Sequence, residues 1–102
     1  RAGYAVCEMR ITPDHLNVNG TVMGGAMFTL ADFAMAVAAN LDEKPTVAIN
    51  CNIRFFSPAK GTKLIATCEA DKAGRRIGFY TVDIKDDLGT YVAQFNATAH
   101  RS

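Results

Sequence analysis

The longest apolar stretch of the chain covers residues 22–40, VMGGAMFTLADFAMAVAAN. Good helix formers dominate it and no proline interrupts it, so it predicts a helix that ends at Asn40, before Asp42 and Pro45. Its apolar residues occupy all sides of the helix, which predicts burial on every side. A membrane span is rejected, because the segment is close to the minimum of about 17 residues and carries Asp32 at its centre.

Alternation of apolar and polar residues outside this helix predicts five strands. They cover residues 3–12, 46–56, 63–71, 75–85 and 90–100. The residues expected to face the core occupy every second position in each strand: Ala5, Cys7, Met9 and Ile11; Val47, Ile49, Cys51, Ile53 and Phe55; Leu64, Ala66, Cys68 and Ala70; Tyr80, Val82 and Ile84; and Tyr91, Ala93, Phe95, Ala97 and Ala99. Turn-forming residues separate the last four strands at 57–61, 73–74 and 86–89.

The predicted order is therefore β-α-β-β-β-β, in a single α+β domain that covers residues 1–102. One long apolar helix needs a surface that covers it on several sides. A curved antiparallel sheet wrapped around the helix supplies that surface, and this arrangement is the hotdog fold. A lone sheet would leave its outer face and its edges exposed, so we expect subunits to pair.

Composition narrows the classes of function. Apolar residues make up 49% of the chain, enough for a core, and the net charge of +1 argues against a general nucleic-acid binder. Cys7, Cys51 and Cys68 fall on core-like positions, which favours reduced thiols in a cytoplasmic protein over a disulfide framework or a nucleophile. His15 and His100 form no zinc-type cluster with the cysteines, so no metal site is expected. No G-x-S-x-G, Walker A or G-x-G-x-x-G motif is present.

Two features interrupt the apolar helix, Asp32 and the pair Gly24-Gly25. An unpaired buried carboxylate is costly, so Asp32 is either a functional group or a buried acid paired with an arginine. The glycines either permit close packing of the helix or leave its first N–H groups uncovered, where their partial positive charge can stabilise an oxyanion. Gly25 and Asp32 lie almost on one face, about two turns apart. With Asp32 activating water or attacking directly, these groups are the inventory for hydrolysing an activated ester, and a neighbouring subunit could supply one of them.

The segment HLNVNGTVMGGAMFTLAD, residues 15–32, resembles the signature H-x-N-x-x-G-x-V-H-G-G-x-x-x-x-L-A-D of the hotdog acyl-CoA thioesterases. Within this family the chain resembles the phenylacetate-degradation thioesterases, and the similarity continues through NCNIRFFSPAKG, AGRRIGFYTVDIKDDLG and ATAHR. The resemblance implies an enzyme that hydrolyses acyl-CoA, with aromatic acyl groups favoured, to a free acid and coenzyme A. It implies no cofactor, because coenzyme A is part of the substrate. Family sites lie at the interface of a homodimer, and the dimers commonly pair into a homotetramer.

Carried over by this resemblance, Asp32 is the catalytic carboxylate, acting as general base or nucleophile. The N–H of Gly24 polarises the thioester carbonyl, and Gly25 belongs to the substrate-binding residues. Asn17 places the water or the thioester, with an Asx-turn in the loop as the alternative. Met23 stands where the family has a histidine and cannot donate or accept hydrogen bonds as imidazole does. Some relatives have a serine where Ala48 lies in this chain.

Aromatic and basic residues complete the expected substrate site. Phe28, Phe33 and Phe55 are expected to line the acyl pocket. The phosphates of coenzyme A call for basic residues at strand ends, and the candidates are Lys60, Lys63, Arg75 and Arg76, with His100 and Arg101 behind them. The alternative for each of these is a solvated surface charge.

Two rival functions remain on the same fold. A non-catalytic acyl-CoA binding or sensing protein is supported mainly by Met23, and it predicts ligand binding without turnover. An acyl-thioester dehydratase would use a histidine with a carboxylate, and it is less favoured because His15 lies in a loop outside the helix.

Overall fold

The computed structural model describes residues 3–40 and 45–101. Its elements, in chain order, are β1 (Tyr4–Arg10), the 3-10 helix η1 (Pro13–His15), α1 (Gly24–Asn40), β2 (Thr46–Phe55), β3 (Lys63–Ala73), β4 (Ile77–Asp86) and β5 (Tyr91–Arg101). The predicted order of one helix and five strands is confirmed. Asp42, named with the predicted helix end, lies outside the described residues.

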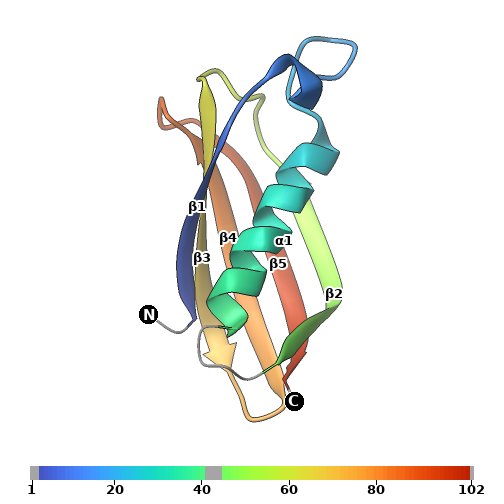
Figure 1. Ribbon diagram of the computed structural model, residues 1–102, viewed down its shortest axis with the longest axis vertical. Helices are drawn as coiled ribbons and strands as arrows, with labels where there is room; N and C mark the ends of the chain where they lie inside the picture. Colours follow the sequence, from blue (N-terminus) through green and yellow to red (C-terminus); the bar gives the residue numbers. More distant parts are fainter. Residues whose placement is uncertain (1–2, 41–44, 102) are drawn as a thin grey trace.

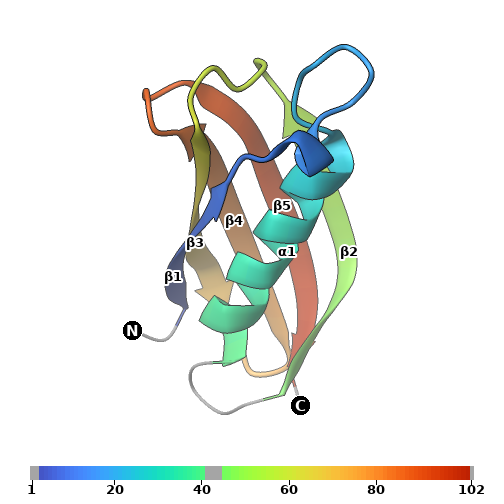
Figure 2. The ribbon, with the colours of Figure 1, turned by 45° about the horizontal axis from the view of Figure 1, so that its top comes forward.

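The strands form one antiparallel sheet in the order β1-β3-β4-β5-β2. The sheet curves around α1, which crosses its inner face from one end to the other (Figure 1). The same arrangement is visible when the top of the molecule is turned forward (Figure 2). The hotdog fold predicted from the element order is therefore confirmed.

The core lies between the inner face of the sheet and one side of α1. The buried residues of the helix follow its i, i+3, i+4 spacing: Met27, Leu30, Ala31, Ala34, Met35, Ala38 and Ala39. They pack against the alternate residues predicted for the central strands, of which Leu64, Ala66, Cys68, Tyr80, Val82, Ile84 and Phe95 are buried. Small helix residues allow the sheet to approach α1 closely, while larger side chains of the strands fill the space.

The prediction that α1 is buried on every side is wrong for the single chain. The side of α1 turned away from the sheet is exposed, and it carries Gly25, Thr29, Asp32, Phe33 and Ala36. The physical reason is that one five-stranded sheet covers only one side of a helix. The apolar residues on the other side therefore need a different partner, or remain in contact with water.

Register shifts in the β2–β5 and β4–β5 pairs expose side chains that the alternation places in the core. The register of β2 against β5 shifts between Ala48 and Asn50, so Val47 and Ile49 are exposed while Ala48 is half-buried. A second shift, between β4 and β5, leaves Tyr91 exposed. The predictions that Val47, Ile49 and Tyr91 face the core are wrong, because each inserted residue moves the strand beyond it to the other face of the sheet.

The two ends of the molecule carry different connections. The start of α1, the β2–β3 connection and the β4–β5 turn lie at one end, and the β3–β4 turn lies at the other end beside the end of α1 (Figure 1). Backbone hydrogen bonds tie the residue before β1 to the end of α1 and to β3. The N–H of Gly3 donates to the carbonyl of Ala38, and the N–H of Ala70 donates to the carbonyl of Gly3. Among the helices that the structure describes, none has the length and apolar character that a bilayer span requires.

Candidate active site

The loop before α1 is held by side chains of its own residues. The N–H of Thr12 donates to Nδ1 of His15 over 3.0 Å. Oδ1 of Asn17 accepts hydrogen bonds from the N–H of Asn19 at 2.9 Å and from the N–H and Oγ1 of Thr21, both at 3.2 Å. The Asx-turn considered for Asn17 is therefore present. The side-chain oxygen Oδ1 of Asn17 accepts hydrogen bonds from the loop itself and not from a group in an open pocket.

This loop leads into α1, and the first backbone N–H groups of the helix donate no hydrogen bond to the described residues. The N–H of Met23 donates to the carbonyl of His15 over 2.7 Å, and the carbonyl of Met23 accepts from Ala26 at 3.1 Å. Among the described residues, the N–H groups of Gly24 and Gly25 have no hydrogen-bond acceptor. Free N–H groups at a helix start carry partial positive charge, so they favour an oxygen that becomes negative.

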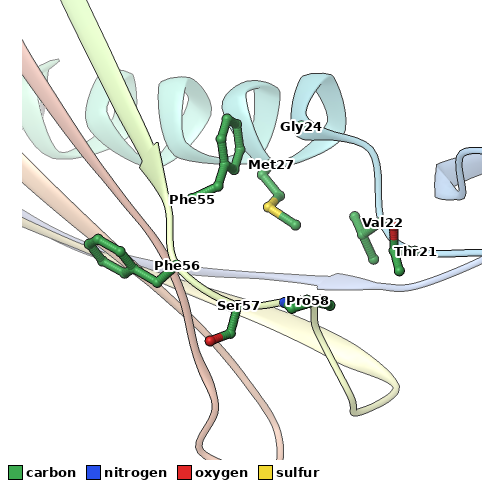
Figure 3. Close-up of a pocket in the computed structure, with 8 residues that line it drawn as sticks. All are labelled: Thr21, Val22, Gly24, Met27, Phe55, Phe56, Ser57 and Pro58. Carbon is green, nitrogen blue, oxygen red and sulfur yellow. The ribbon is translucent and has the colours of Figure 1, made fainter. Parts of the chain in front are cut away.

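A pocket of about 360 Å³ opens at this helix start. Its lining consists of Thr21, Val22, Gly24, Met27, Phe55, Phe56, Ser57 and Pro58 (Figure 3). The ring of Phe55 lies beside the first turn of α1, and a Cβ added to Gly24 would come within 2.8 Å of the Cζ atom of Phe55. Close packing, the alternative weighed for the glycines, therefore holds for Gly24. It does not hold for Gly25, where an added Cβ would meet no atom within 4 Å.

Asp32 lies on the exposed side of α1 and does not line this pocket. It lies eight positions after Gly24 in the sequence, which places it about 12 Å further along the helix axis. Burial raises the pKa of the Cys51 thiol on β2, and the negative charge of Asp32 raises it further. In the single chain, the alternative of a buried acid paired with an arginine does not hold, because Asp32 is exposed and no ion pair joins it to any described residue.

Comparison with known proteins identifies the family. The family model named Thioesterase superfamily matches residues 19–93. The chain belongs to the thioesterase superfamily. The acyl-coenzyme A thioesterase PaaI of Escherichia coli K12 is 36% identical to it over 100 residues, which are 97% of this chain and 71% of that protein. This thioesterase spans about two thirds to three quarters of the length of the first curated relatives that it matches.

Solved structures agree with the fold. The E. coli PaaI protein from the phenylacetic acid degradation operon superposes with a TM-score of 0.94 and 34% identity, over 99% of this chain and 74% of that chain. The BH2602 protein of Bacillus halodurans, solved with CoA, superposes with a TM-score of 0.88 and 26% identity, over 95% of this chain and 66% of that chain. The prediction of a thioesterase is thus confirmed at the level of the family.

The aromatic residues named for the acyl pocket of the thioesterase lie in different places. Phe55 lines the pocket, whereas Phe28 packs edge-to-face on Phe95, with ring centroids 5.2 Å apart. Phe33 is 61% exposed on the outer side of α1. Met23, beside the pocket in sequence, is 38% exposed. In one chain, Phe55 alone of the three phenylalanines contacts the pocket.

The basic residues named for the phosphates of coenzyme A do not gather at the pocket of one chain. Lys60 is exposed in the β2–β3 connection, at the same end as the helix start. Lys63 forms an ion pair with Glu8, with 3.6 Å between Nζ of the lysine and Oε2 of the glutamate. Arg75 and Arg76 belong to the β3–β4 turn at the opposite end (Figure 1). The remaining two candidates at the end of β5 also differ, since His100 is exposed and Arg101 is buried with Nη1 donating to the hydroxyl of Tyr80.

Sequence reasoning missed most of the pocket lining. Val22 and Met27 were assigned to the helix core, and Ser57 and Pro58 to a turn. The Ser57-Pro58 turn follows β2, an edge strand of the sheet, and no local signal in the chain predicts that this turn lies near the helix start.

The cysteines offer the thioesterase no alternative nucleophile. All three are free, and burial raises the pKa of each thiol, that of Cys68 to about 12. A protonated thiol is a poor nucleophile, so the expectation from the sequence agrees with these environments. Within the described residues, no three His, Cys, Asp or Glu side chains come together as a metal site.

Proposed function

We propose that this chain hydrolyses acyl-CoA thioesters to a free acid and coenzyme A. The observation that carries the proposal is the uncovered N–H of Gly24 at the wall of an apolar pocket, beside Phe55. A thioester carbonyl placed there accepts a hydrogen bond that strengthens as negative charge develops on its oxygen. The thioesterase activity for which the E. coli relative is named and the CoA in the B. halodurans structure support the substrate class.

The proposed reaction assigns one step to each group. Asp32 takes a proton from a water whose oxygen attacks the carbonyl carbon, or its carboxylate attacks that carbon itself. The N–H of Gly24 stabilises the oxyanion of the tetrahedral intermediate. The carbon–sulfur bond then breaks and coenzyme A leaves as a thiolate that takes up a proton. Attack by water leaves the free acid directly, whereas attack by the carboxylate leaves an anhydride of Asp32 and the acyl group, which water then hydrolyses to the free acid. Asn17 contributes by holding the loop that presents the helix start, and a direct contact of its amide with water or thioester stays a prediction.

A single chain keeps these groups apart, so we place the site between two chains. About 12 Å along one helix is too far for Asp32 to reach a carbonyl bound at Gly24 of the same chain. Two α1 helices that run antiparallel, about a two-fold axis close to residue 28, would bring the partner's Asp32 level with Gly24, because 24 and 32 are equally distant from 28. The exposed side of α1, with Phe33 and Ala36, offers the surface for this contact.

The further details of the proposal rest on other surfaces. Contact across the outer face of the sheet, where Ile77 and Phe79 are exposed, would pair two dimers into a homotetramer. Aromatic acyl groups, such as phenylacetyl, are supported by the apolar lining of the pocket and by the operon of the E. coli neighbour. Cytoplasmic localisation stays a prediction, supported by three free cysteines.

A non-catalytic acyl-CoA binder is the second candidate, and Met23 is the observation that favours it. The Met23 side chain lies at the helix start without the donor or acceptor of an imidazole. Such a protein would bind acyl-CoA through the same pocket and release no thiol.

The experiment that separates the two measures free thiol released from a panel of aromatic and aliphatic acyl-CoAs. We expect turnover by the wild type and a loss of at least about 100-fold in kcat for Asp32→Asn, since the general base or nucleophile is removed. Asp14→Asn is the matched control, because Asp14 is an exposed acid in η1 whose removal changes the net charge equally. A wild type that binds the panel without releasing thiol would instead establish the binder.

A further inference from the structure

The β4–β5 turn contains a buried carboxylate that the proposed reaction does not use. Asp86 is 2% exposed. Its Oδ1 accepts the N–H groups of Leu88 at 3.0 Å and Thr90 at 2.8 Å, both within its own turn. Its Oδ2 accepts the N–H groups of Lys60 at 2.8 Å and Gly61 at 3.0 Å, from the β2–β3 connection. Four backbone donors on one carboxylate are sufficient to compensate for its burial.

The pKa of Asp86 reflects this balance. Burial alone raises the pKa of a carboxyl group, but the N–H groups of Lys60, Thr90 and Gly61 lower that of Asp86 to about 2. The group therefore remains ionised, and able to accept all four bonds, throughout the neutral and mildly acidic range.

Asp86 fixes one side of the connection that forms the pocket wall. At the other side, the N–H groups of Phe56 at 2.8 Å and Ser57 at 3.4 Å donate to the carbonyl of Val92. Both anchors belong to the β4–β5 hairpin or its strands. Ser57 belongs to this second anchor and Pro58 follows it, and both residues line the pocket at the start of α1 (Figure 3).

Asp87 holds the neighbouring part of the chain. Its Oδ1 accepts the N–H of Thr62 at 2.8 Å, and its Oδ2 accepts the Thr62 hydroxyl at 2.8 Å. A weaker bond at 3.3 Å ties it to Lys63, the first residue of β3. Asp87 thus anchors the start of a strand, whereas Asp86 anchors the wall-forming connection. Gly61 lies between the two, since its N–H reaches Asp86 and an added Cβ would collide with Oδ1 of Asp87.

We propose that Asp86 is a positioning residue for acyl-thioester binding, acting through Lys60 and Gly61 to hold the Ser57-Pro58 wall against the pocket. The kinetic part of this inference rests on the proposed thioesterase function. If the wall retreats, the acyl group loses contact in the ground state and the transition state alike, so KM rises while kcat changes little.

The test compares Asp86→Asn with Asp87→Asn, which remove the same charge from adjacent positions. An amide has one acceptor oxygen, so Asp86→Asn keeps one pair of donors and loses the other. We expect the pair in its own turn to be kept, because backbone bonds from Asp86 to Thr90 and from Gly89 to Asp86 hold that turn closed. Hydrogen exchange should then accelerate at Lys60 and Gly61 in Asp86→Asn alone.

Thiol release is measured below the melting temperature of each variant. Asp86→Asn should raise KM about tenfold and leave kcat within about twofold of the wild type. Asp87→Asn should leave the ratio of KM between bulky and small acyl groups unchanged. Gly61→Ala, which keeps both carboxylates but displaces the connection, should change KM in the same direction as Asp86→Asn. Unchanged exchange at Lys60 and Gly61, or equal KM changes in the two aspartate variants, would overturn the proposal. Exchange needs no turnover, so an inactive wild type would count against the thioesterase function alone.

Discussion

At the scale of single residues, the two glycines that begin α1 have different surroundings. An added Cβ would approach the Phe55 ring at Gly24 and would meet open space at Gly25. Gly24→Ala should therefore push the Phe55 ring into the pocket and lower kcat/KM at least about tenfold, because small displacements at a reacting centre are costly. Gly25→Ala should lower kcat/KM less than Gly24→Ala does. Steady-state thiol release with a matched acyl-CoA measures both losses.

Stability provides the control for this pair. Phe55 is 54% exposed, so its ring can rotate away without opening the core. Both variants should retain the wild-type melting temperature within a few degrees, since alanine also favours the helical state. Equal losses of kcat/KM in the two variants would show that contact with Phe55 has no part in the effect.

The residues of the site differ in how far the sequence alone could place them. Gly24 was found from a local signal, a glycine pair at the start of an apolar helix, and its uncovered N–H is a local consequence. Asp32 is predicted as an acid in an apolar helix, but it is exposed in the single chain, because its burial depends on what covers that side of α1. Ser57 and Pro58 could not be found, since their place beside the helix start depends on strand order.

At the scale of elements, alternation predicted the inner faces of β3 and β4 and failed where the sheet is irregular. Leu64 and Val82 are buried as expected. On β2, one residue without a partner at the bulge reverses the faces, so Val47 is exposed and Ala48 is turned toward the core. The sequence pattern does not reveal this bulge, because apolar residues continue at every second position on both sides of the inserted residue.

The exposed side of α1 carries its own prediction. Phe33 is 61% exposed there, although the helix pattern calls for burial on that side as well. If that side pairs with a second copy, Phe33→Lys should weaken the dimer at least about tenfold and lower activity in parallel, because buried aromatic contacts dominate such interfaces. Sedimentation equilibrium over a dilution series measures the dimer constant.

The matched control for this variant is Val6→Lys. Val6 lies on β1, the edge strand at the other side of the sheet from β2. Val6 is 49% exposed and replacing it adds the same charge, but it lies on the other edge strand. We expect Val6→Lys to leave the dimer constant within about twofold of the wild type, as is usual for surface changes away from an interface. A Val6→Lys variant that dissociates while Phe33→Lys stays dimeric would place the contact at β1 instead.

At the scale of the whole molecule, the proposed site requires two chains, and mixing two inactive variants tests this. Asp32→Asn keeps an intact Gly24, and Gly24→Val keeps an intact Asp32. In a mixed dimer, Gly24 of the first variant meets the partner's Asp32, so one of the two sites is complete. Refolding the two variants together at equal amounts should give half mixed dimers and roughly a quarter of wild-type activity, as expected for random pairing about a two-fold axis. If both groups acted within one chain, every site in the mixture would lack one of them and no activity would return.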